Sequence, residues 1–390
     1  MDNEPINEVT PEVSQPALEK SAVRAKITAL AKRWFIDAFS GMAQGLFCTL
    51  IAGTILAQIA SWCGDNAFAM TLLTISKIAK SLMGAGIGVG IASKLGAKPL
   101  VVFTAAVTGM VGAFASPLVD VLTKGAAFTF ALGAPGNPIG AYVLTLFTME
   151  IALLYAGKTK LDIVLVPLGM MVLILGGIFL AWPFIKLIDL LGIGIAKAIE
   201  AGVAVKIIVG VFVAVIMGVL LTMPTSSAAI WIAITAAVSA EYVDALSIAG
   251  GAAVAGCAAH MVGFAVASFR ENGVGGLISQ GIGTSMLQIP NIMKKPVIML
   301  PEIVASAVSG LVAVLLDLRC NAAGGGMGTS GLVGVFGAVE ASQNAGLPAW
   351  KIALGVILCL FVIPAAVSFT VSEILRKKNI IAAGDQKLEA

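Results

Sequence analysis

Long apolar runs separated by short polar turns dominate the sequence from residue 36 to residue 375. Ten of these runs are candidates for membrane-spanning helices, although several are shorter than the ~20 residues that a straight crossing needs. They cover residues 36–62, 82–96, 98–115, 139–157, 161–182, 203–223, 227–243, 246–268, 297–318 and 350–374. The pattern predicts an all-α polytopic membrane protein with about ten transmembrane helices.

Three segments between or before these runs alternate apolar and charged positions at helical spacing. Residues 21–35, 64–80 and 184–201 each place several charged side chains, such as Lys77 and Lys186, beside aliphatic ones. Such a pattern is typical of helices that lie along the membrane surface. We therefore expect interfacial amphipathic helices there, with the alternative that the two later segments are irregular packing helices. Residues 184–201 would also join two halves of the chain.

Two stretches, residues 268–296 and 319–348, are too polar and glycine-rich to span a membrane, yet too apolar for solvated loops. Non-helical backbone at membrane depth survives only where it is buried in protein or lines a cavity, so we expect two re-entrant hairpins. The motifs Gly283–Ser285 and Gly328–Ser330 bring backbone N–H groups and hydroxyls together, which could replace the water around a polyhydroxy solute. The alternative is tight packing of glycines between helices.

Composition supports this interpretation, because 59% of the 390 residues are hydrophobic and 12% are charged. Soluble domains have about 45–50% apolar and about 25% charged residues. A net charge of +3 is too small to indicate a nucleic-acid partner. If both termini are cytoplasmic, alternating crossings place twice as many Lys and Arg inside as outside, which agrees with the positive-inside rule.

The known enzyme and metal motifs are missing from the sequence. It contains no GxSxG, GxxxxGK[ST] or HExxH pattern, its five cysteines form no CxxC pair, and it has one histidine. We expect no metal site and no cofactor. The sequence also offers no soluble region long enough to carry a phosphorylated His or Cys domain, so we do not expect an enzyme acting by itself.

Polar residues inside the apolar runs are the candidates for function, because their burial is costly unless they are paired or used. His260 shares a helical face with Gly256 and Gly263, so it faces a close backbone or a cavity. Glu302 follows Pro301, where an acid is also an ordinary helix-start residue. The predicted solute-binding residues are Thr225, Ser226, His260, Gln280, Thr284, Ser285, Gln288, Asn291, Glu302, Asn321, Thr329 and Ser330. Arg270, Glu271 and Asn272 are predicted to form a cytoplasmic gate or, alternatively, a solvated turn.

Several of these residues belong to sequence blocks that resemble a known family. The blocks are PTSS at 224–227, HMVGFAVASFREN at 260–272, GTSMLQIPN at 283–291 and GMGTSGLVG at 326–334. In this order they resemble the membrane subunit (EIIC) of phosphotransferase-system sugar permeases. The most similar branch comprises EIIC-like proteins, also described as perfringolysin O regulator-like proteins.

The resemblance implies a ten-span fold, usually homodimeric, with a dimerising half at 36–202 and a transport half at 203–375. Its hairpins, around Gln280–Asn291 and Asn321–Gly331, would face one central site, and the tails 1–35 and 376–390 would be cytoplasmic. Glucose-type permeases carry a Gly-Ile-Thr-Glu-Pro signature, which is absent here. EIIA- and EIIB-like domains are also absent, so coupled phosphorylation either needs partner proteins or does not take place.

Together these observations predict a transporter of a small polar solute, such as a sugar, in the bacterial cytoplasmic (inner) membrane. It would contact membrane lipids and move its solute by alternating access of the hairpin-bearing half. A membrane sensor that binds a ligand in the same cavity without moving it is the alternative. An integral-membrane enzyme is a weaker third hypothesis.

Overall fold

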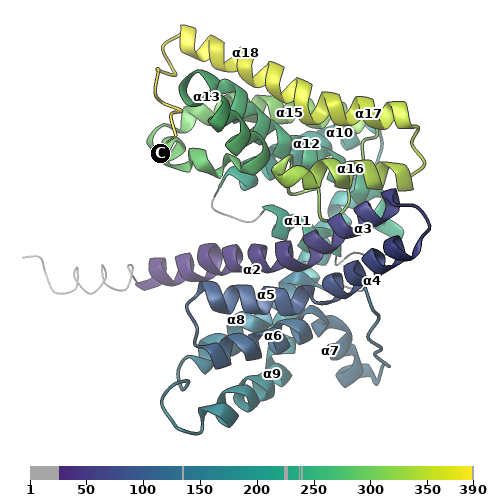
Figure 1. Cartoon of the computed structure of the whole chain (residues 1–390), viewed down its shortest axis with the longest axis vertical. Coiled ribbons are helices and arrows are strands. Elements are labelled where there is room, and N and C mark those ends of the chain that lie inside the picture. The colour runs from purple at the N-terminus through teal and green to yellow at the C-terminus, as the bar shows by residue number, and fades with distance from the viewer. Residues whose placement is uncertain (1–25, 134–135, 224–226, 237, 239, 389–390) are drawn as a thin grey trace, which may run out of the picture.

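The computed structural model describes residues 26–133, 136–223, 227–236, 238 and 240–388, and within this part every regular element is helical (Figure 1). The helices of the first half are α2 (Ala38–Leu46), α3 (Ala52–Trp62), α4 (Ala67–Ser81), α5 (Met83–Lys94), α6 (Pro99–Ala113), α7 (Ala115–Lys124), α8 (Pro138–Ala152) and α9 (Asp162–Glu200). Those of the second half are α10 (Val203–Thr222), α11 (Ser227–Ala236), α12 (Val243–Ala267), α13 (Phe269–Ile278), α14 (Ile289–Lys294), α15 (Leu300–Leu315), α16 (Val333–Asn344), α17 (Ala349–Ile357) and α18 (Ile363–Lys377).

The chain begins with one long helix that includes the end of a segment predicted to be a separate surface helix. The helix runs from Lys26 to Trp62 and contains π-helical turns at Arg33–Asp37 and Phe47–Ile51. Residues 26–35 contain neither proline nor glycine, so nothing in the sequence stops the helix before the apolar run. The predicted separate surface helix at 21–35 is therefore wrong for its described part.

Helices α4 and α5 form a bent pair, and so do α6 and α7. The bends are 54° between α4 and α5 and 65° between α6 and α7. The predicted helix at 64–80 corresponds to α4, whose first turn is capped by the Asn66 side chain accepting from the Ala69 N–H at 2.8 Å. The helix is confirmed, and its position along a membrane surface stays a prediction.

Helix α9 is 39 residues long and continues through Pro183. At 1.5 Å per residue it is ~58 Å long, roughly twice the hydrocarbon thickness of a bilayer. The predicted surface helix at 184–201 is therefore not a separate element but the second part of α9. The helix continues past Pro183 although this residue offers no N–H. Beyond it, Ile185 packs in an apolar cluster of the first half, whereas Ala196 and Ile199 pack against residues of the second half.

Helix α12 is the centre of the second half. It is almost entirely buried, and α10, α15 and α18 pack around it. Its many alanines and glycines allow this close approach: a Cβ added to Gly256 would lie 1.9 Å from the carbonyl oxygen of Ala214 in α10. The two halves form separate layers in Figure 1, with α2 to α9 below and α12 to α18 above.

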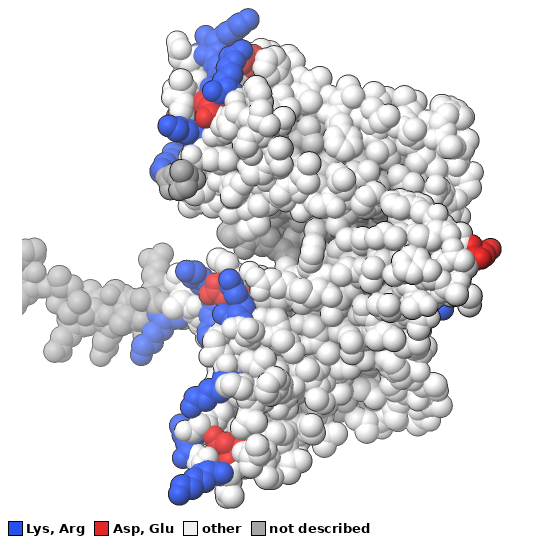
Figure 2. Space-filling model, viewed as in Figure 1, with Lys and Arg blue, Asp and Glu red and all other residues white. Residues whose placement is uncertain are grey.

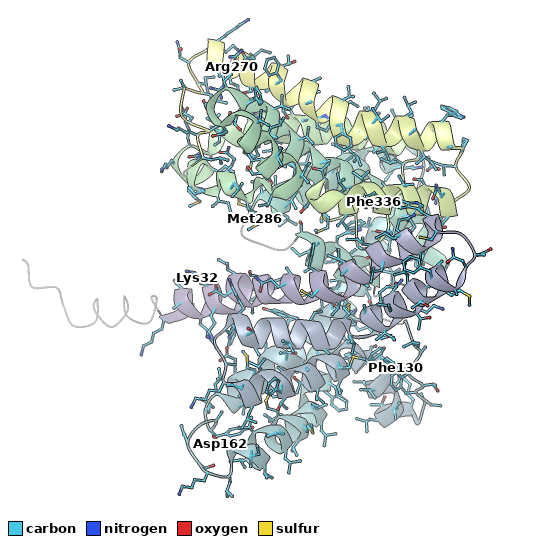
Figure 3. All side chains as sticks on the ribbon, in the orientation of Figure 1. Lys32, Phe130, Asp162, Arg270, Met286 and Phe336 are labelled. Carbon is cyan, nitrogen blue, oxygen red and sulfur yellow. The ribbon has the colours of Figure 1, made fainter. Side chains whose placement is uncertain are left out.

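Six helices in the described part are long and apolar enough to cross a membrane, or up to eight if each bent pair is one span. The number is below the predicted ten, partly because the candidate run at 227–243 contains only the ten-residue α11. Basic side chains gather along one edge of the molecule (Figure 2), where Lys32, Asp162 and Arg270 lie (Figure 3). The arrangement is that of a multi-pass membrane protein with many of its basic side chains at one end.

Candidate functional site

Both segments predicted as hairpins reverse direction, and they start from opposite ends of α12. The first leaves the end of α12 at Ser268, runs through α13, turns after Gly283 and returns through α14. The second starts at Cys320, whose N–H donates to the Ser247 carbonyl near the start of α12 at 2.9 Å. It returns through α16. Hairpins are therefore present at both predicted places, and their depth in a bilayer stays a prediction.

The tips of the two hairpins meet beside the middle of α12. The Thr329 hydroxyl donates to the Gly281 carbonyl at 2.6 Å, and the Ser330 hydroxyl donates to the Gly283 carbonyl at 2.9 Å. Thr329 also lies 3.6 Å from the Met261 sulfur. The structure thus brings Thr329 and Ser330 to the first hairpin, where their hydroxyls join the two tips through backbone carbonyls.

A buried chain of polar groups lies behind this junction. The Thr222 Oγ1 is 2.8 Å from Nδ1 of His260 and 3.0 Å from Oγ of Ser285, and all three residues have no exposed surface. Sequence reasoning missed Thr222, although it is the only hydroxyl residue in the run 203–223. It lies four residues after Gly218, whose added Cβ would be 2.5 Å from Cδ2 of His260. The four-residue spacing places Thr222 on the same helical face as Gly218, and this is the signal that could have found it.

A cavity of about 390 Å³ separates the two halves next to this chain. Its wall on the second half includes Leu221, Ser227, Met286 and Met327, and its wall on the first half includes Lys94. Figure 2 shows the hollow opening toward the charged edge, and Figure 3 places Met286 on the side of the second half that faces α2. Leu221 and Met286 are the chain neighbours of Thr222 and Ser285, so the buried polar chain lies directly behind the cavity wall.

The predicted amide residues form a second chain inside the first hairpin. Gln280 Nε2 donates to the Ser268 hydroxyl at 3.0 Å, Gln288 Nε2 to Gln280 Oε1 at 2.8 Å, and Asn291 Nδ2 to Gln288 Oε1 at 2.8 Å. Thr284 is half-buried and accepts from the Met286 N–H at 3.2 Å, which stabilises the turn. These groups fix the shape of the hairpin.

Three predicted residues lie elsewhere or cannot be placed. Asn321 lines another cavity, of about 510 Å³, at the opposite end of α12 beside Asp244 and Arg319, and its amide donates to Glu340. Thr225 and Ser226 lie outside the described residues.

Comparison with known proteins adds a family to this geometry. The family model described as "Phosphotransferase system, EIIC" matches residues 36–388. The chain belongs to the phosphotransferase system EIIC family. No curated protein and no solved structure matches it. The resemblance inferred from the four sequence blocks is confirmed, and the protein is a membrane transporter component of EIIC type.

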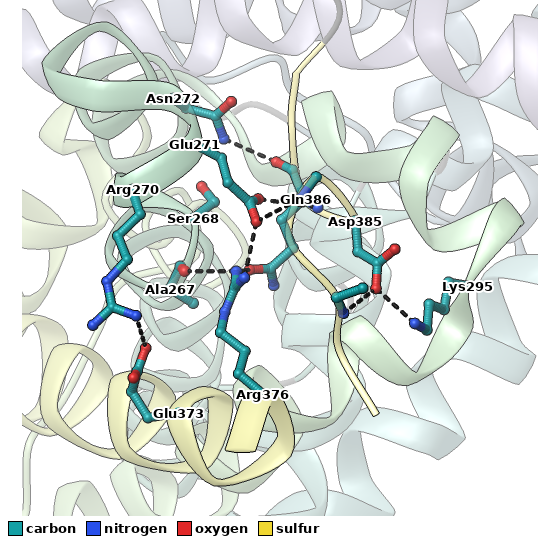
Figure 4. Close-up of polar contacts among 12 residues, drawn as sticks. Ala267, Ser268, Arg270, Glu271, Asn272, Lys295, Glu373, Arg376, Asp385 and Gln386 are labelled. Carbon is teal, nitrogen blue, oxygen red and sulfur yellow. Dashed lines mark hydrogen bonds and ion pairs between the residues drawn. The ribbon is translucent and has the colours of Figure 1, made fainter. Parts of the chain in front are cut away.

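Two of the three predicted gate residues of this EIIC family member, Glu271 and Asn272, contact the C-terminal segment, residues 379–388, which crosses the open end of the first hairpin (Figure 4). The Glu271 carboxylate accepts from Arg376 at 2.9 Å and from the backbone N–H groups of Gly384 and Gln386 at 3.0 and 3.1 Å. Asn272 donates to the Gln386 carbonyl at 2.9 Å. Glu271 and Asn272 are therefore not in a solvated turn, whereas the exposed Arg270 pairs with Glu373 at 2.9 Å.

The return limb of the hairpin holds the same segment. Gln288 and Asn291 donate to the carbonyls of Gln386 and Lys387, each at 2.9 Å, and Lys295 pairs with Asp385 at 2.6 Å. Desolvation raises the pKa of Asp385, but hydrogen bonds from Lys295 and a backbone N–H outweigh it and lower the pKa below its usual value. The predicted cytoplasmic tail at 376–390 is thus, up to residue 388, a packed part of the second half.

Glu302, the last predicted solute-binding residue, is fully buried in the first turn of α15. It does not line the cavity between the halves. Neither carboxyl oxygen has a hydrogen-bond partner among the residues that the structure describes. Within the same part of the chain, no group of three His, Cys, Asp or Glu residues could hold a metal ion.

Proposed function

We propose that this EIIC family member moves a small polar solute, a sugar or a related metabolite, across the bacterial cytoplasmic membrane. The second half, residues 203–375, would shift as a body against the first half, residues 36–202. The observation that carries the proposal is the meeting of two hairpin tips beside a cavity of about 390 Å³ and the buried Thr222–His260–Ser285 chain.

The wall of the cavity suits a solute with both apolar and hydroxyl surfaces. Its volume lies within the ~300–1,000 Å³ typical of small-molecule sites. Met286, Met327 and Leu221 offer apolar contact to the C–H face of a ring, and Met side chains adapt to irregular shapes. Behind them, Ser285 and His260 supply hydroxyl and imidazole groups that can exchange their present hydrogen bonds for bonds to solute hydroxyls.

The arrangement of the hairpins suggests how access alternates. Each hairpin enters from a different end of α12, so a shift of the second half would expose the meeting point of the tips first to one side and then to the other. The excess of basic residues at one edge favours the cytoplasmic side there, with Arg270, Glu271 and Asn272 as its gate. Dimerisation through the first half, and phosphorylation of the solute by separate EIIA- and EIIB-like proteins, complete the proposal.

Uptake by the purified protein in proteoliposomes tests the proposal. A panel of radiolabelled monosaccharides and polyols is compared in protein-containing and empty vesicles. Loss of one hydrogen bond to a solute costs ~1 kcal/mol or more, so Ser285→Ala and His260→Gln should each lower kcat/KM for uptake about tenfold.

The matched control is Thr370→Ala, which removes an exposed hydroxyl of α18 that donates to the Ala366 carbonyl. Its uptake should equal that of the wild type. If both site variants also keep wild-type uptake, the proposed site is wrong. Saturable binding of a solute that never enters the vesicles would instead support a sensor.

A further inference from the structure

A buried acidic side chain in the second half has no partner for its charge. Glu302 has no exposed surface, and its carboxyl oxygens are unpaired among the described residues. Ser368 of α18 lies beside it: a Cβ added to Gly263 of α12 would be 3.0 Å from Glu302 Cγ and 2.4 Å from Ser368 Oγ. Because α12, α15 and α18 pack against one another, three helices enclose the carboxyl group.

Further buried polar atoms around this carboxyl group are also unpaired. The hydroxyls of Ser368 and of Ser372, one turn further along α18, have no hydrogen-bond partner in the described part of the chain. Nε2 of His260 is likewise unpaired there, and His260 lies one turn before Gly263 on α12. Buried polar groups in native proteins are nearly always hydrogen-bonded. Several such unpaired groups in one place point to a binding site.

No basic side chain neutralises Glu302 in the part of the chain that the structure covers. Of the elements packed against it, α12 contributes His260 and α18 contributes Glu373 and Arg376, near the charged edge. Glu373 and Arg376 already have ion-pair partners, as does Lys206 at the far end of α10. An isolated ionised carboxylate at this depth is strongly unfavourable, so a proton or another cation must balance its charge.

We propose that Glu302 and Ser368 form a binding site for one monovalent cation, a proton or Na⁺, which is bound and released in each transport cycle. Carboxylate and hydroxyl oxygens are hard ligands, which suit both ions. A divalent cation normally takes several carboxylates, and Glu302 offers one. The inference rests on the proposed transport function and couples the movement of the solute to the binding of a cation.

The site lies one helical turn from the proposed solute site, which provides the coupling. Ser306, one turn after Glu302 on α15, donates to the Gly256 carbonyl at 3.1 Å. A Cβ added to Gly218 would be 2.9 Å from Ser306 Oγ and 2.5 Å from Cδ2 of His260. His260 therefore lies beside Ser306, which is one helical turn from Glu302, and it is linked through Thr222 to Ser285. We expect occupancy of the cation site to shift His260 and, through it, the solute site.

Thermal unfolding of the purified full-length protein tests cation binding without any solute. The temperature of unfolding is measured in Na⁺ or choline at constant ionic strength, over a range of pH, for the wild type and Glu302→Gln. A bound cation stabilises the folded state, so Na⁺ should raise the wild-type Tm at high pH, and Glu302→Gln should lose that whole shift. If the cation is a proton, Na⁺ has no effect, and the wild-type Tm should instead fall with rising pH while that of Glu302→Gln does not.

Two more variants separate a specific site from general damage. Ser368→Ala removes one oxygen ligand. If the cation is Na⁺, this variant should need a several-fold higher Na⁺ concentration to reach half of the Tm shift. If the cation is a proton, the dependence of Tm on pH should be unchanged. Glu150→Gln neutralises a carboxylate that is paired with Arg33 at 2.8 Å and should keep the full wild-type cation response. If Glu302→Gln does not fold, the dependence of the wild-type Tm on Na⁺ and pH still tests the inference.

A wild-type Tm that depends on neither Na⁺ nor pH overturns the inference, and so does a cation response that Glu302→Gln retains. Because no solute is involved, this result leaves the proposed transport function standing. Conversely, if the protein responds to the cation but takes up no solute, the result contradicts the proposed transport function and supports the cation-binding site.

Discussion

Two groups of buried polar side chains in the second half differ in how well they are paired. At the charged edge, Glu271 accepts three hydrogen bonds, and the C-terminal segment is tied to both limbs of the first hairpin. Further from this edge, the side chains of Glu302, Ser368 and Ser372 have no hydrogen-bond partner in the described part of the chain. The side chains of both groups have little or no exposed surface, so burial alone does not explain the difference.

The comparison separates structural polar groups from binding groups. A network that is satisfied within the protein holds its elements in one arrangement, and it has little left to offer a ligand. Groups that stay unpaired lower the stability of the fold, and a bound ion or solute can recover that loss. We therefore assign the edge network to the shape of the hairpin and the deep cluster to binding.

Glu271→Ala should have the largest effect on stability. The side chains of Glu271 and Arg376 are only 9% and 14% exposed, so removing the carboxylate leaves a buried guanidinium without its ion-pair partner. The expected loss is roughly 3–5 kcal/mol in the free energy of unfolding, measured by chemical denaturation. Arg270→Ala is the control: it breaks an exposed pair with Glu373 and should cost about 0–1 kcal/mol. Equal effects of the two variants would contradict the structural role of the edge network.

Thr222→Val should have a moderate effect, because Nδ1 of His260 loses its partner at 2.8 Å in a buried place. The expected loss is about 1–3 kcal/mol in the free energy of unfolding. Ser372→Ala is the matched control within the deep cluster: its hydroxyl has no partner in the described residues, so its removal should change stability by less than about 0.5 kcal/mol. A larger loss for Ser372→Ala than for Thr222→Val would mean that the cluster is paired after all.

Much of the fold followed from the sequence, because apolar run length is a direct consequence of bilayer thickness. The helices α10, α12 and α15 lie close to their predicted runs. Both hairpins could be predicted for a related reason, since segments that combine glycines with many polar residues are too polar to cross a bilayer as simple helices. The errors are continuities: α9 passes through Pro183 without a break, and the first helix already begins at Lys26, within a segment whose basic residues favoured a separate surface helix.

The candidate site could be predicted only in part, since hydrogen-bond partners depend on tertiary contacts. His260 was found from its lone polar character, but its partner Thr222 is 38 residues away in the chain. Gln288 and Asn291 were expected to face a solute, and they bind the C-terminal segment about 95 to 100 residues later. An amide side chain looks the same in sequence whether it serves a ligand or a backbone carbonyl.

Asp385 provides the smallest and most local test of the edge network. Although desolvation raises its pKa, hydrogen bonds from Lys295 and the Ala382 N–H lower the pKa below that of an unfolded aspartate, which is about 3.9. A carboxyl group with a lowered folded pKa stabilises the fold above its unfolded pKa, and this stabilisation disappears as the pH falls through the folded pKa. The side chains of Asp385 and Lys295 are 22% and 36% exposed, so solvent screens their pairing and the effect should stay below about 1 kcal/mol.

The measurement is hydrogen exchange at Gly384–Leu388, expressed as protection relative to the unfolded chain. At neutral pH, Asp385→Asn should show less protection than the wild type, because it loses the ion pair with Lys295 at 2.6 Å. As the pH falls through the lowered pKa of Asp385, the wild type protonates this carboxyl group, and the two proteins should converge. Asp120→Asn, which breaks the distant surface pair with Lys124, should not change protection there. If the difference at residues 384–388 persists unchanged at low pH, it reflects the side chain's shape rather than its charge, and the edge network depends on its neutral hydrogen bonds.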